Sequence, residues 1–258
     1  MYQMLDPHEL VVFITGATSG FGEATARRFA QAGAKVIATG RRRERLEALQ
    51  AELGAENCHI AELDVSDNAA IEAVVNALPA GFAHVNVVVA NAGLALGLAP
   101  AHETDLSDWQ TMIDTNVTGL VQTVRALLPG MIERGEGHIV TMGSVASDYP
   151  YPGGNVYAAT KAFVKQFALA LRADINGKNV RVTNIEPGMT ETEFSVVRFE
   201  GDQQAADKVY EGMTPMTAED IAESIFWVTT LPRHFNVNRL QMMPVAQAFS
   251  PFAVHRGE

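Results

Sequence analysis

A tyrosine and a lysine four residues apart, Tyr157 and Lys161, are the pair in this chain best suited to proton transfer. On a helix, side chains at that spacing lie on one face, one turn apart. A free phenol has a pKa of about 10 and is a poor base near neutral pH, but a neighbouring ammonium group favours the phenolate and lowers that pKa. The same spacing also occurs by chance on helices whose tyrosine and lysine only face solvent. The pair therefore gains meaning from the rest of the chain.

Two more polar residues, Ser144 and Asn116, stand where the predicted elements could bring them toward that pair. Ser144 follows an apolar run at 137–142 that predicts a strand, and it precedes Tyr157 by 13 residues. Catalytic groups gather at the carboxyl ends of strands in open α/β sheets, although a serine there can equally cap a turn or a helix. Asn116 lies inside a helix expected at about 109–128, where the ordinary alternative is an amide that faces solvent or bonds back to its own helix.

A glycine-spaced loop near the amino end predicts a phosphate site. An apolar run at 10–15 reads as a buried strand, and a helical pattern continues to about residue 32. Between them lies the spacing G-x-x-x-G-x-G, which lets the backbone approach a ligand at the amino end of a helix, where N–H groups are free. An ordinary tight turn is the alternative. The candidate cofactor-binding residues here are Thr15, Gly16, Thr18, Ser19, Gly20, Phe21 and Gly22.

Three consecutive arginines follow the second predicted strand, at 35–39. Dinucleotide folds that prefer NAD carry an acidic residue about 20 positions beyond the glycine loop, which binds the ribose 2′-hydroxyl. Here Arg41, Arg42 and Arg43 stand in that region, at the start of a helix expected at 44–53. Cations oppose the dipole at the amino end of a helix unless an anion lies nearby. We therefore expect the 2′-phosphate of NADP(H) to bind Arg41 and Arg42, and Arg43 to be solvated.

Strands and helices alternate along most of the chain. Further strands are expected at 59–63, 85–90, 180–185 and 240–243, with helices that start near Ser66 and at 155–171 and 217–229. This order predicts a single α/β domain over residues 1–258, a Rossmann-like doubly wound parallel sheet with helices on both faces. In the helix at 155–171 we expect a buried apolar face, formed by Val156, Ala159, Phe163, Phe167 and Ala170.

Two segments fall outside that alternation. Residues 189–212 show no strand pattern, and a connection of this length after a strand end is typical of a lid. We place the cofactor-binding and catalytic core at 10–188 and a substrate lid at 189–215. The tail at 244–258 contains Phe249, Phe252 and Val254. Since exposed aromatic residues are unusual at a terminus, we expect the tail to pack either on its own chain or on another subunit.

Composition narrows the classes of function. The net charge of −11 and the isoelectric point near 5.1 argue against general binding to nucleic acid or to acidic membranes. The sequence shows no signal peptide, no apolar run long enough to span a membrane and no pattern of metal ligands. The single cysteine, Cys58, excludes an intrachain disulfide and fits a reducing compartment, so we expect a cytoplasmic protein.

Taken in order, these motifs resemble the short-chain dehydrogenase/reductase family over nearly the whole chain. The matching positions are the glycine loop, Asp64, the turn Asn91-Ala92-Gly93, Asn116, Ser144, Tyr157, Lys161 and Pro187-Gly188. Ala90 is one departure, since the family usually has asparagine there. Asp64 could accept a hydrogen bond from the adenine amino group, or it could cap the helix near Ser66.

The resemblance implies a role for each of these residues. Tyr157 would be the general acid in carbonyl reduction and the base in the reverse direction. Lys161 would lower the pKa of Tyr157 and hold the nicotinamide ribose, Ser144 would bind the substrate oxygen, and Asn116 would hold a water that supplies protons to Lys161. Further cofactor contacts are implied for Val65, Asn91, Ala92, Gly93, Pro187, Gly188 and either Thr190 or Thr192. A homotetramer is also implied.

A closer resemblance concerns the substrate. Five stretches look like the branch that acts on small 3-hydroxy acids, such as serine and 3-hydroxypropionate: ATGRRRERL, NAGLALG, MIDTNVTGLV, GGNVYAATKAFVKQF and EFSVVRF. Three others look like sulfoacetaldehyde reductases: PGMTETEF, GDQQAADKVYEGMTP and AFSPFAVHR. Both substrate types carry an anionic group, for which we expect Arg198 in the lid to be the cation; a plain surface arginine is the alternative. Weaker candidates for binding this anionic group in the substrate site are Tyr210, Gln247 and Arg256.

Two other functions compete with an oxidoreductase of small acidic compounds. One is a dinucleotide sensor without turnover, and the other is a reductase of larger substrates.

Overall fold

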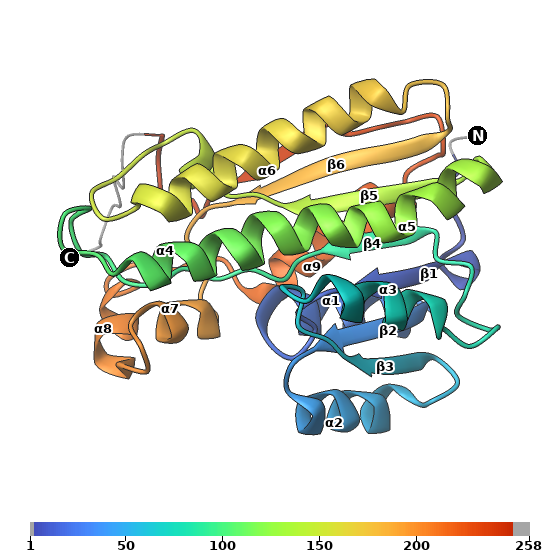
Figure 1. The fold of residues 1–258 in the computed structure, drawn as a ribbon, viewed down its shortest axis with the longest axis horizontal. Coiled ribbons are helices and arrows are strands. Elements are labelled where there is room, and N and C mark those ends of the chain that lie inside the picture. Colours follow the sequence, from blue (N-terminus) through green and yellow to red (C-terminus); the bar gives the residue numbers. More distant parts are fainter. Residues whose placement is uncertain (1–2, 250–258) are drawn as a thin grey trace.

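The computed structural model describes residues 3–249, which form one layered α/β unit (Figure 1). Phe252, Val254 and Arg256 therefore lie outside the described residues, and the expectation for the tail stays a prediction. Short elements, at Pro7–Glu9, Asp114–Gly119 (η2) and Val145–Ser147 (η3), accompany the main ones. In chain order the main elements are β1 (Val11–Ile14), α1 (Gly20–Gln31), β2 (Lys35–Gly40), α2 (Arg43–Leu53), β3 (Cys58–Glu62), α3 (Asn68–Asn76), β4 (Val87–Ala90), α4 (Leu106–Ile113), α5 (Leu120–Arg134), β5 (Gly137–Met142), α6 (Asn155–Asp174), β6 (Val180–Pro187), α7 (Glu193–Arg198), α8 (Gln203–Lys208), α9 (Ala218–Thr230) and β7 (Arg239–Met242).

The described residues form a seven-stranded sheet in the order β3-β2-β1-β4-β5-β6-β7, with every neighbouring pair parallel. The order reverses direction between β1 and β4, which is the switch point where open α/β sheets bind ligands. This confirms the predicted doubly wound parallel sheet.

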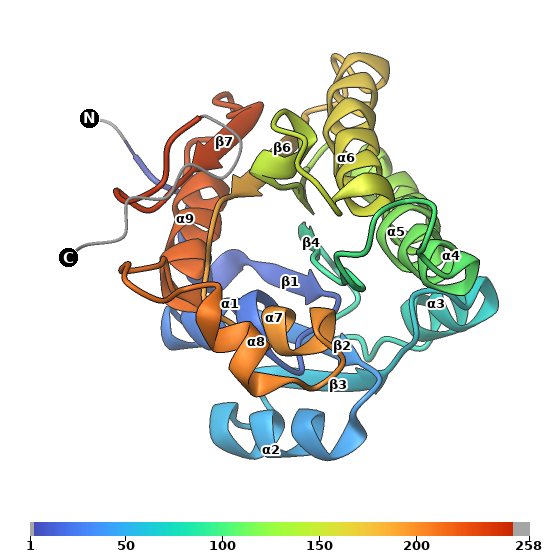
Figure 2. The same ribbon diagram turned by 90° about the vertical axis from the view of Figure 1, so that its left-hand side faces the viewer.

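Successive side chains along each strand point to opposite faces of the sheet, and each face has its own apolar core. Val12 and Ile14 of β1 pack on one face with α1, α2 and α9, whereas Phe13 between them packs on the other face with α3, α5 and α6. Figure 2 shows the two groups of helices on opposite sides of the sheet. Because both faces are buried, the strands read as continuous apolar runs rather than as alternating ones.

The predicted buried face of α6 is wrong at three of its five residues, since only Val156 and Phe167 are partly buried against the core. Phe163 is 41% exposed, and Ala159 and Ala170 are exposed as well. The buried side lies about one residue further along the turn, and it carries Tyr157, Thr160, Lys161, Val164, Ala168 and Leu171. The apolar pattern on the outer side was misleading because it was as regular as the pattern on the inner side. Of the polar side chains on the inner side, Tyr157 and Lys161 line the cavity described below.

The predicted helix at 109–128 starts earlier and ends later than expected. The helical segment runs from Leu106 to Arg134, and it widens to a π-helical turn at Asp114–Gly119. Asn116 lies in that turn and is 1% exposed. The widened turn directs the Asn116 side chain inward. Its amide therefore neither faces solvent nor bonds back to its own helix.

The cap of α3 is Asp67 rather than Asp64. The Asp67 carboxylate accepts hydrogen bonds from the backbone N–H groups of Ala69 and Ala70. Asp64 instead accepts from the N–H and the hydroxyl of Ser66, which closes the turn before the helix. The capping alternative for Asp64 is thus excluded, and its carboxylate lines the cavity at the strand ends.

Candidate active site

A cavity of about 690 Å³ opens at the carboxyl ends of the strands, between the sheet and the lid at 189–215. Of the predicted site residues, those in its wall are Gly16, Thr18, Ser19, Gly20, Phe21, Arg41, Arg42, Asp64, Val65, Asn91, Ala92, Gly93, Ser144, Tyr157, Lys161, Pro187, Gly188, Thr190, Thr192 and Arg198. Thr15, Gly22 and Asn116 are not part of the wall. One continuous cavity therefore joins the glycine loop, the tyrosine–lysine pair and the predicted lid.

Within residues 3–249, no group of His, Cys, Asp and Glu side chains is arranged to hold a metal ion. In the same part of the chain, no helix combines the length and the apolar character needed to cross a bilayer.

The glycine loop is shaped by close backbone contacts. Gly16 and Gly20 have φ values of 69° and 53°, in the left-handed region that favours glycine. A Cβ on Gly22 would lie 2.3 Å from the carbonyl oxygen of Gly16, so the loop closes only with glycine at that position. Asn91 fastens the loop to β4 because its amide donates to the carbonyl oxygens of Thr15 and Gly16. Gly22 and Thr15, which lie outside the cavity wall, thus help to set its shape.

The three arginines after β2 have different environments. Arg41 is 67% exposed, and its Nη1 lies 3.8 Å from an Asp64 carboxylate oxygen. Arg43 is exposed and pairs with Glu47 one turn along α2, as expected for a solvated residue. Arg42 is already bonded: Nε and Nη2 donate to Thr18 and Ser19.

A fourth arginine, Arg45, joins this group and was not predicted from the sequence. Its Nη1 donates to the Thr18 carbonyl oxygen at 3.2 Å and to Glu193 of the lid at 2.7 Å. Arg42 contacts the other Glu193 oxygen at 2.9 Å. The spacing of Arg42 and Arg45 on adjacent helix turns was a signal for a shared partner, but the acid lies about 150 residues further along the chain, where no local pattern reveals it.

Tyr157 lies at the bottom of the cavity and is 8% exposed. Burial raises the pKa of its phenol to about 12, and the charge of Tyr151 adds to that rise; a hydrogen bond with the Ser144 hydroxyl and the charge of Arg198 oppose it by favouring the phenolate. The Arg198 guanidinium lies 5.3 Å from the centre of the Tyr157 ring. The sequence predicted that Lys161 lowers the pKa of Tyr157, whereas in the structure the pKa is raised and the charge that opposes the rise is that of Arg198.

Lys161 is buried one turn away, as predicted, and its ammonium lies 5.8 Å from the centre of the Tyr157 ring. Its Nζ donates to the carbonyl oxygen of Met142 at the end of β5, at 2.8 Å. Burial lowers the pKa of Lys161 to about 8, because a desolvated ammonium is disfavoured. Its charge is therefore sensitive to pH near neutrality.

Asn116 stands behind this pair and holds the backbone around it. Its carbonyl oxygen accepts from the N–H of Leu94, and its amide donates to the Leu94 carbonyl oxygen, each at 2.8 Å. The amide also reaches the Thr160 hydroxyl, which in turn donates to the carbonyl oxygen of Tyr157. Asn116 thereby links the strand end after β4 to the helix that carries Tyr157 and Lys161.

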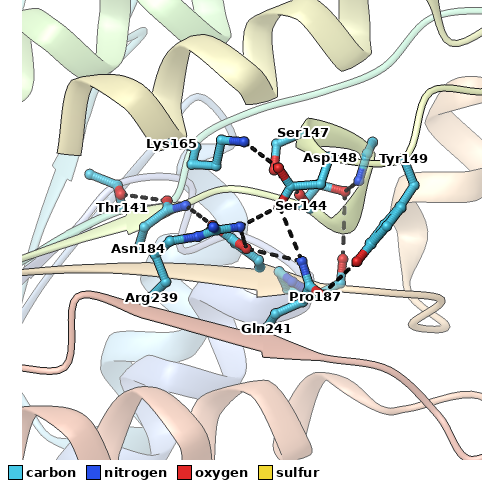
Figure 3. A network of polar contacts seen from close by, with 12 residues as sticks. Thr141, Ser144, Ser147, Asp148, Tyr149, Lys165, Asn184, Pro187, Arg239 and Gln241 are labelled. Carbon is cyan, nitrogen blue, oxygen red and sulfur yellow. Dashed lines mark hydrogen bonds and ion pairs between the residues drawn. The ribbon is translucent and has the colours of Figure 1, made fainter. Parts of the chain in front are cut away.

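Ser144 is both a turn cap and a cavity residue. Its hydroxyl accepts from the N–H of Ala146 at 3.1 Å, which caps the short turn Val145–Ser147. The following Asp148 is held by ion pairs with Lys165 of α6 and Arg239 of β7 (Figure 3). Arg239 also forms a two-bond contact with the fully buried Glu186, at 2.7 Å for each bond. Two-bond arginine–carboxylate pairs fix the relative orientation of the groups that they join. This network therefore holds the turn that carries Ser144 against β6 and β7.

Residues of the predicted lid form the cavity wall beside Tyr157. Arg198 contacts the hydroxyl of Tyr151, and the ring of Phe194 lies 5.7 Å from the ring of Tyr157. Neither aromatic residue was predicted as a site residue, since nothing in their spacing marks them. Tyr210 also lies in the cavity wall and bonds the Thr190 carbonyl oxygen and Ser195 within the lid. Gln247 accepts from the N–H of Met189, next to the Pro187–Gly188 turn.

The comparisons agree with this geometry. A family model for short chain dehydrogenases matches residues 10–203. The chain belongs to the short-chain dehydrogenase/reductase family. It is 58% identical to the NADP-dependent 3-hydroxy acid dehydrogenase YdfG of Salmonella typhi over 248 residues, 96% of this chain and 100% of that protein. It is 56% identical to the serine 3-dehydrogenase of Agrobacterium fabrum over 245 residues, 95% of this chain and 98% of that protein.

A solved structure is similar as well. The closed form of a serine dehydrogenase complexed with NADP+ superposes with a TM-score of 0.93 and 56% identity, over 96% of this chain and 100% of that one. As a short-chain dehydrogenase/reductase, this chain has the residues of its predicted tetrad, Asn116, Ser144, Tyr157 and Lys161, close together around one cavity end.

Proposed function

We propose that the protein is an NADP-dependent dehydrogenase that interconverts a small acidic 3-hydroxy compound, such as 3-hydroxypropionate or serine, and its aldehyde or ketone. The observation that carries the substrate class is Arg198, whose guanidinium stands above the Tyr157 ring in the cavity that also contains the glycine loop. The proton-transfer residue Tyr157, the glycine loop and the cation Arg198 thus line the same cavity, with Arg198 within reach of a small substrate bound at Tyr157.

The residues of the cavity fit NADP(H). The amino end of α1 has no side-chain cap from Ser19, so its N–H groups are available to a pyrophosphate. Arg41, beside Asp64, has its guanidinium at the end of β2, where the 2′-phosphate is expected. When bound, the nicotinamide supplies or accepts the hydride. Pro187, Gly188 and either Thr190 or Thr192 would hold it, because all four line the cavity beside Tyr157.

In the reductive direction Tyr157 gives its proton to the carbonyl oxygen of the substrate, and in the oxidative direction it takes the proton back. Ser144 donates a hydrogen bond to the same oxygen and stabilises the charge that develops there. Lys161 holds the nicotinamide ribose and keeps the local field positive, which favours the phenolate. Asn116 positions the helix of this pair and would hold the water that resupplies protons to Lys161.

The acidic group of the substrate would pair with the forked donors of Arg198. Relatives at 56–58% identity are named for 3-hydroxy acids and serine, which supports a carboxylate substrate. A sulfonate satisfies the same cation, so a sulfoacetaldehyde reductase that forms isethionate is the alternative. A dinucleotide sensor is disfavoured because Tyr157, Lys161 and Ser144 are all in place. A larger substrate is disfavoured because the lid closes on the cavity.

The test is an oxidation panel with NADP+ and with NAD+. We expect kcat/KM for 3-hydroxypropionate, serine or isethionate to exceed that for 1-propanol by at least about tenfold, the size of one charge-assisted contact, and NADP+ to be preferred. Equal rates on 1-propanol would contradict the substrate class. Tight NADPH binding without turnover on any alcohol or aldehyde would favour the sensor.

We also propose a homotetramer in the cytoplasm. The outer face of α6 carries Phe163 and Phe167, whose rings stack at 5.9 Å, and Phe163 is 41% exposed. A second copy of the chain would cover this apolar face, and light scattering of the purified protein measures the resulting mass. A monomer at micromolar concentration would contradict the proposal.

A further inference from the structure

The lid helix α7 spans the cavity with a charged residue at each end. At its carboxyl end, Arg198 is held by Gly97, whose N–H donates to the Arg198 carbonyl oxygen at 3.0 Å. At its amino end, Glu193 reaches Arg42 and Arg45 of the α2 region. Figure 2 shows α7 in front of the ends of the strands, close to α2 and α8. A helix of six residues is too short to be stable alone, so the contacts at its ends set its position.

The amino end of α7 also lies against the phosphate loop. Thr192, its N-cap residue, is 3.5 Å from the position of a Cβ on Gly20. The Thr18 carbonyl oxygen accepts from both Arg42 and Arg45, the two arginines that Glu193 binds. The Glu193 carboxylate therefore ties three separate segments together: the lid, the glycine loop and the start of α2.

The carboxylate and a 2′-phosphate can bind this cluster at the same time. A guanidinium has five N–H donors, and Arg42 uses four of them in the contacts of the described residues, one on Glu193. Arg45 uses only Nη1, which leaves Nε and Nη2 without a protein acceptor in residues 3–249. Arg41 contributes a further guanidinium. The donors suffice for both anions, so Glu193 does not have to leave when a phosphate binds.

We propose that Glu193 is a positioning residue that latches α7 shut over bound NADP(H), through the arginines beside the 2′-phosphate site. This rests on the proposed place of the 2′-phosphate near Arg41. Because α7 also carries Arg198, the latch on the cofactor side sets the position of the cation on the substrate side. Cofactor retention and substrate binding are thereby coupled through one short helix.

Glu193→Gln tests the latch, and Glu47→Gln is the matched control, since Glu47 is also a partly exposed carboxylate paired with an arginine, but its partner Arg43 lies with it on α2 and the pair does not reach the lid. The measurements are the dissociation rate of NADPH by stopped-flow fluorescence and amide hydrogen exchange over residues 193–198 in the NADPH complex. We expect about fivefold faster dissociation in Glu193→Gln, which is about 1 kcal/mol, faster exchange in α7, and no change in Glu47→Gln.

A double-mutant cycle separates the latch from a general effect of charge. Arg45→Ala should accelerate dissociation, and Arg45→Ala with Glu193→Gln should add little to either single change, because the two residues belong to one contact. Unchanged dissociation and exchange in Glu193→Gln would overturn the latch. Tighter NADPH binding in that variant would also overturn it, since the carboxylate would then repel the phosphate. The substrate panel is measured on the wild type, so it can fail or succeed independently.

Discussion

Replacing Arg198 by alanine should remove the preference for acidic substrates. The guanidinium lies 5.3 Å from the centre of the Tyr157 ring, close enough for its donors to meet a carboxylate on a three-carbon substrate whose oxygen is at Tyr157. A hydrogen bond to a charged group contributes about 1.5–3 kcal/mol. At about 1.4 kcal/mol for each tenfold change, kcat/KM for 3-hydroxypropionate should fall by roughly 10- to 150-fold.

Arg198 also acts on Tyr157, which predicts a second effect. Its positive charge favours the phenolate and lowers the pKa of Tyr157. In Arg198→Ala that pKa should rise, so the ascending limb of the oxidation rate against pH, along which the phenolate forms, should move to higher pH for every alcohol. Neutral alcohols should therefore lose activity at a fixed pH through kcat and not through KM, whereas acids should lose mainly through KM.

The assay is initial-rate oxidation with saturating NADP+, for 3-hydroxypropionate and 1-propanol, between pH 7 and 10. Lys208→Ala is the control, because it removes a lid cation that is exposed and is not part of the cavity wall. Arg198→Lys should be intermediate, since it keeps the charge but loses the fork. Equal losses of kcat/KM for the acid and for 1-propanol, both through KM, would refute the reasoning and leave Arg198 with only a structural role in the lid.

Three other changes test the cavity. Tyr157→Phe should lower kcat by at least about a hundredfold, since general acid–base groups contribute about 10² to 10⁴, while the Kd for NADPH measured by calorimetry changes little; comparable turnover would exclude Tyr157 as the proton donor. Arg41→Ala should raise KM for NADPH about tenfold, with Arg43→Ala as the control, and equal increases for NADH would exclude a 2′-phosphate contact. Because burial lowers the pKa of Lys161 to about 8, its ammonium is lost as pH rises through that value, so kcat/KM for aldehyde reduction should fall above pH 8; a flat profile up to pH 10 would contradict a charged Lys161 in the step.

Much of the fold could be predicted from the sequence because the relevant signals are local. The apolar strands and the glycine loop lie within short windows, and the Tyr157–Lys161 spacing places the two residues on one helical face. The alternation of strands and helices then predicted the doubly wound parallel sheet, which the structure confirms.

The failures come from contacts across long distances in the chain. The outer face of α6 was taken for the buried one because Phe163 and Phe167 repeat as regularly as the residues that pack inside. Asp64 stands just before the predicted helix, as a cap would, but the side chain that accepts hydrogen bonds from the first N–H groups of α3 is that of Asp67. The charge of Arg198 on Tyr157 depends on where the lid folds back, and no spacing within the lid reveals that.

The central claim is that one cavity joins NADP(H), Tyr157 and a cation for an acidic substrate. The most direct measurement is kcat/KM for NADPH-dependent reduction of malonic semialdehyde, sulfoacetaldehyde and propanal by the unmodified protein. We predict that malonic semialdehyde exceeds propanal by at least about tenfold, as expected for one charge-assisted contact, and that sulfoacetaldehyde is the slower of the two acids. Propanal reduced as efficiently as both acids would contradict the account.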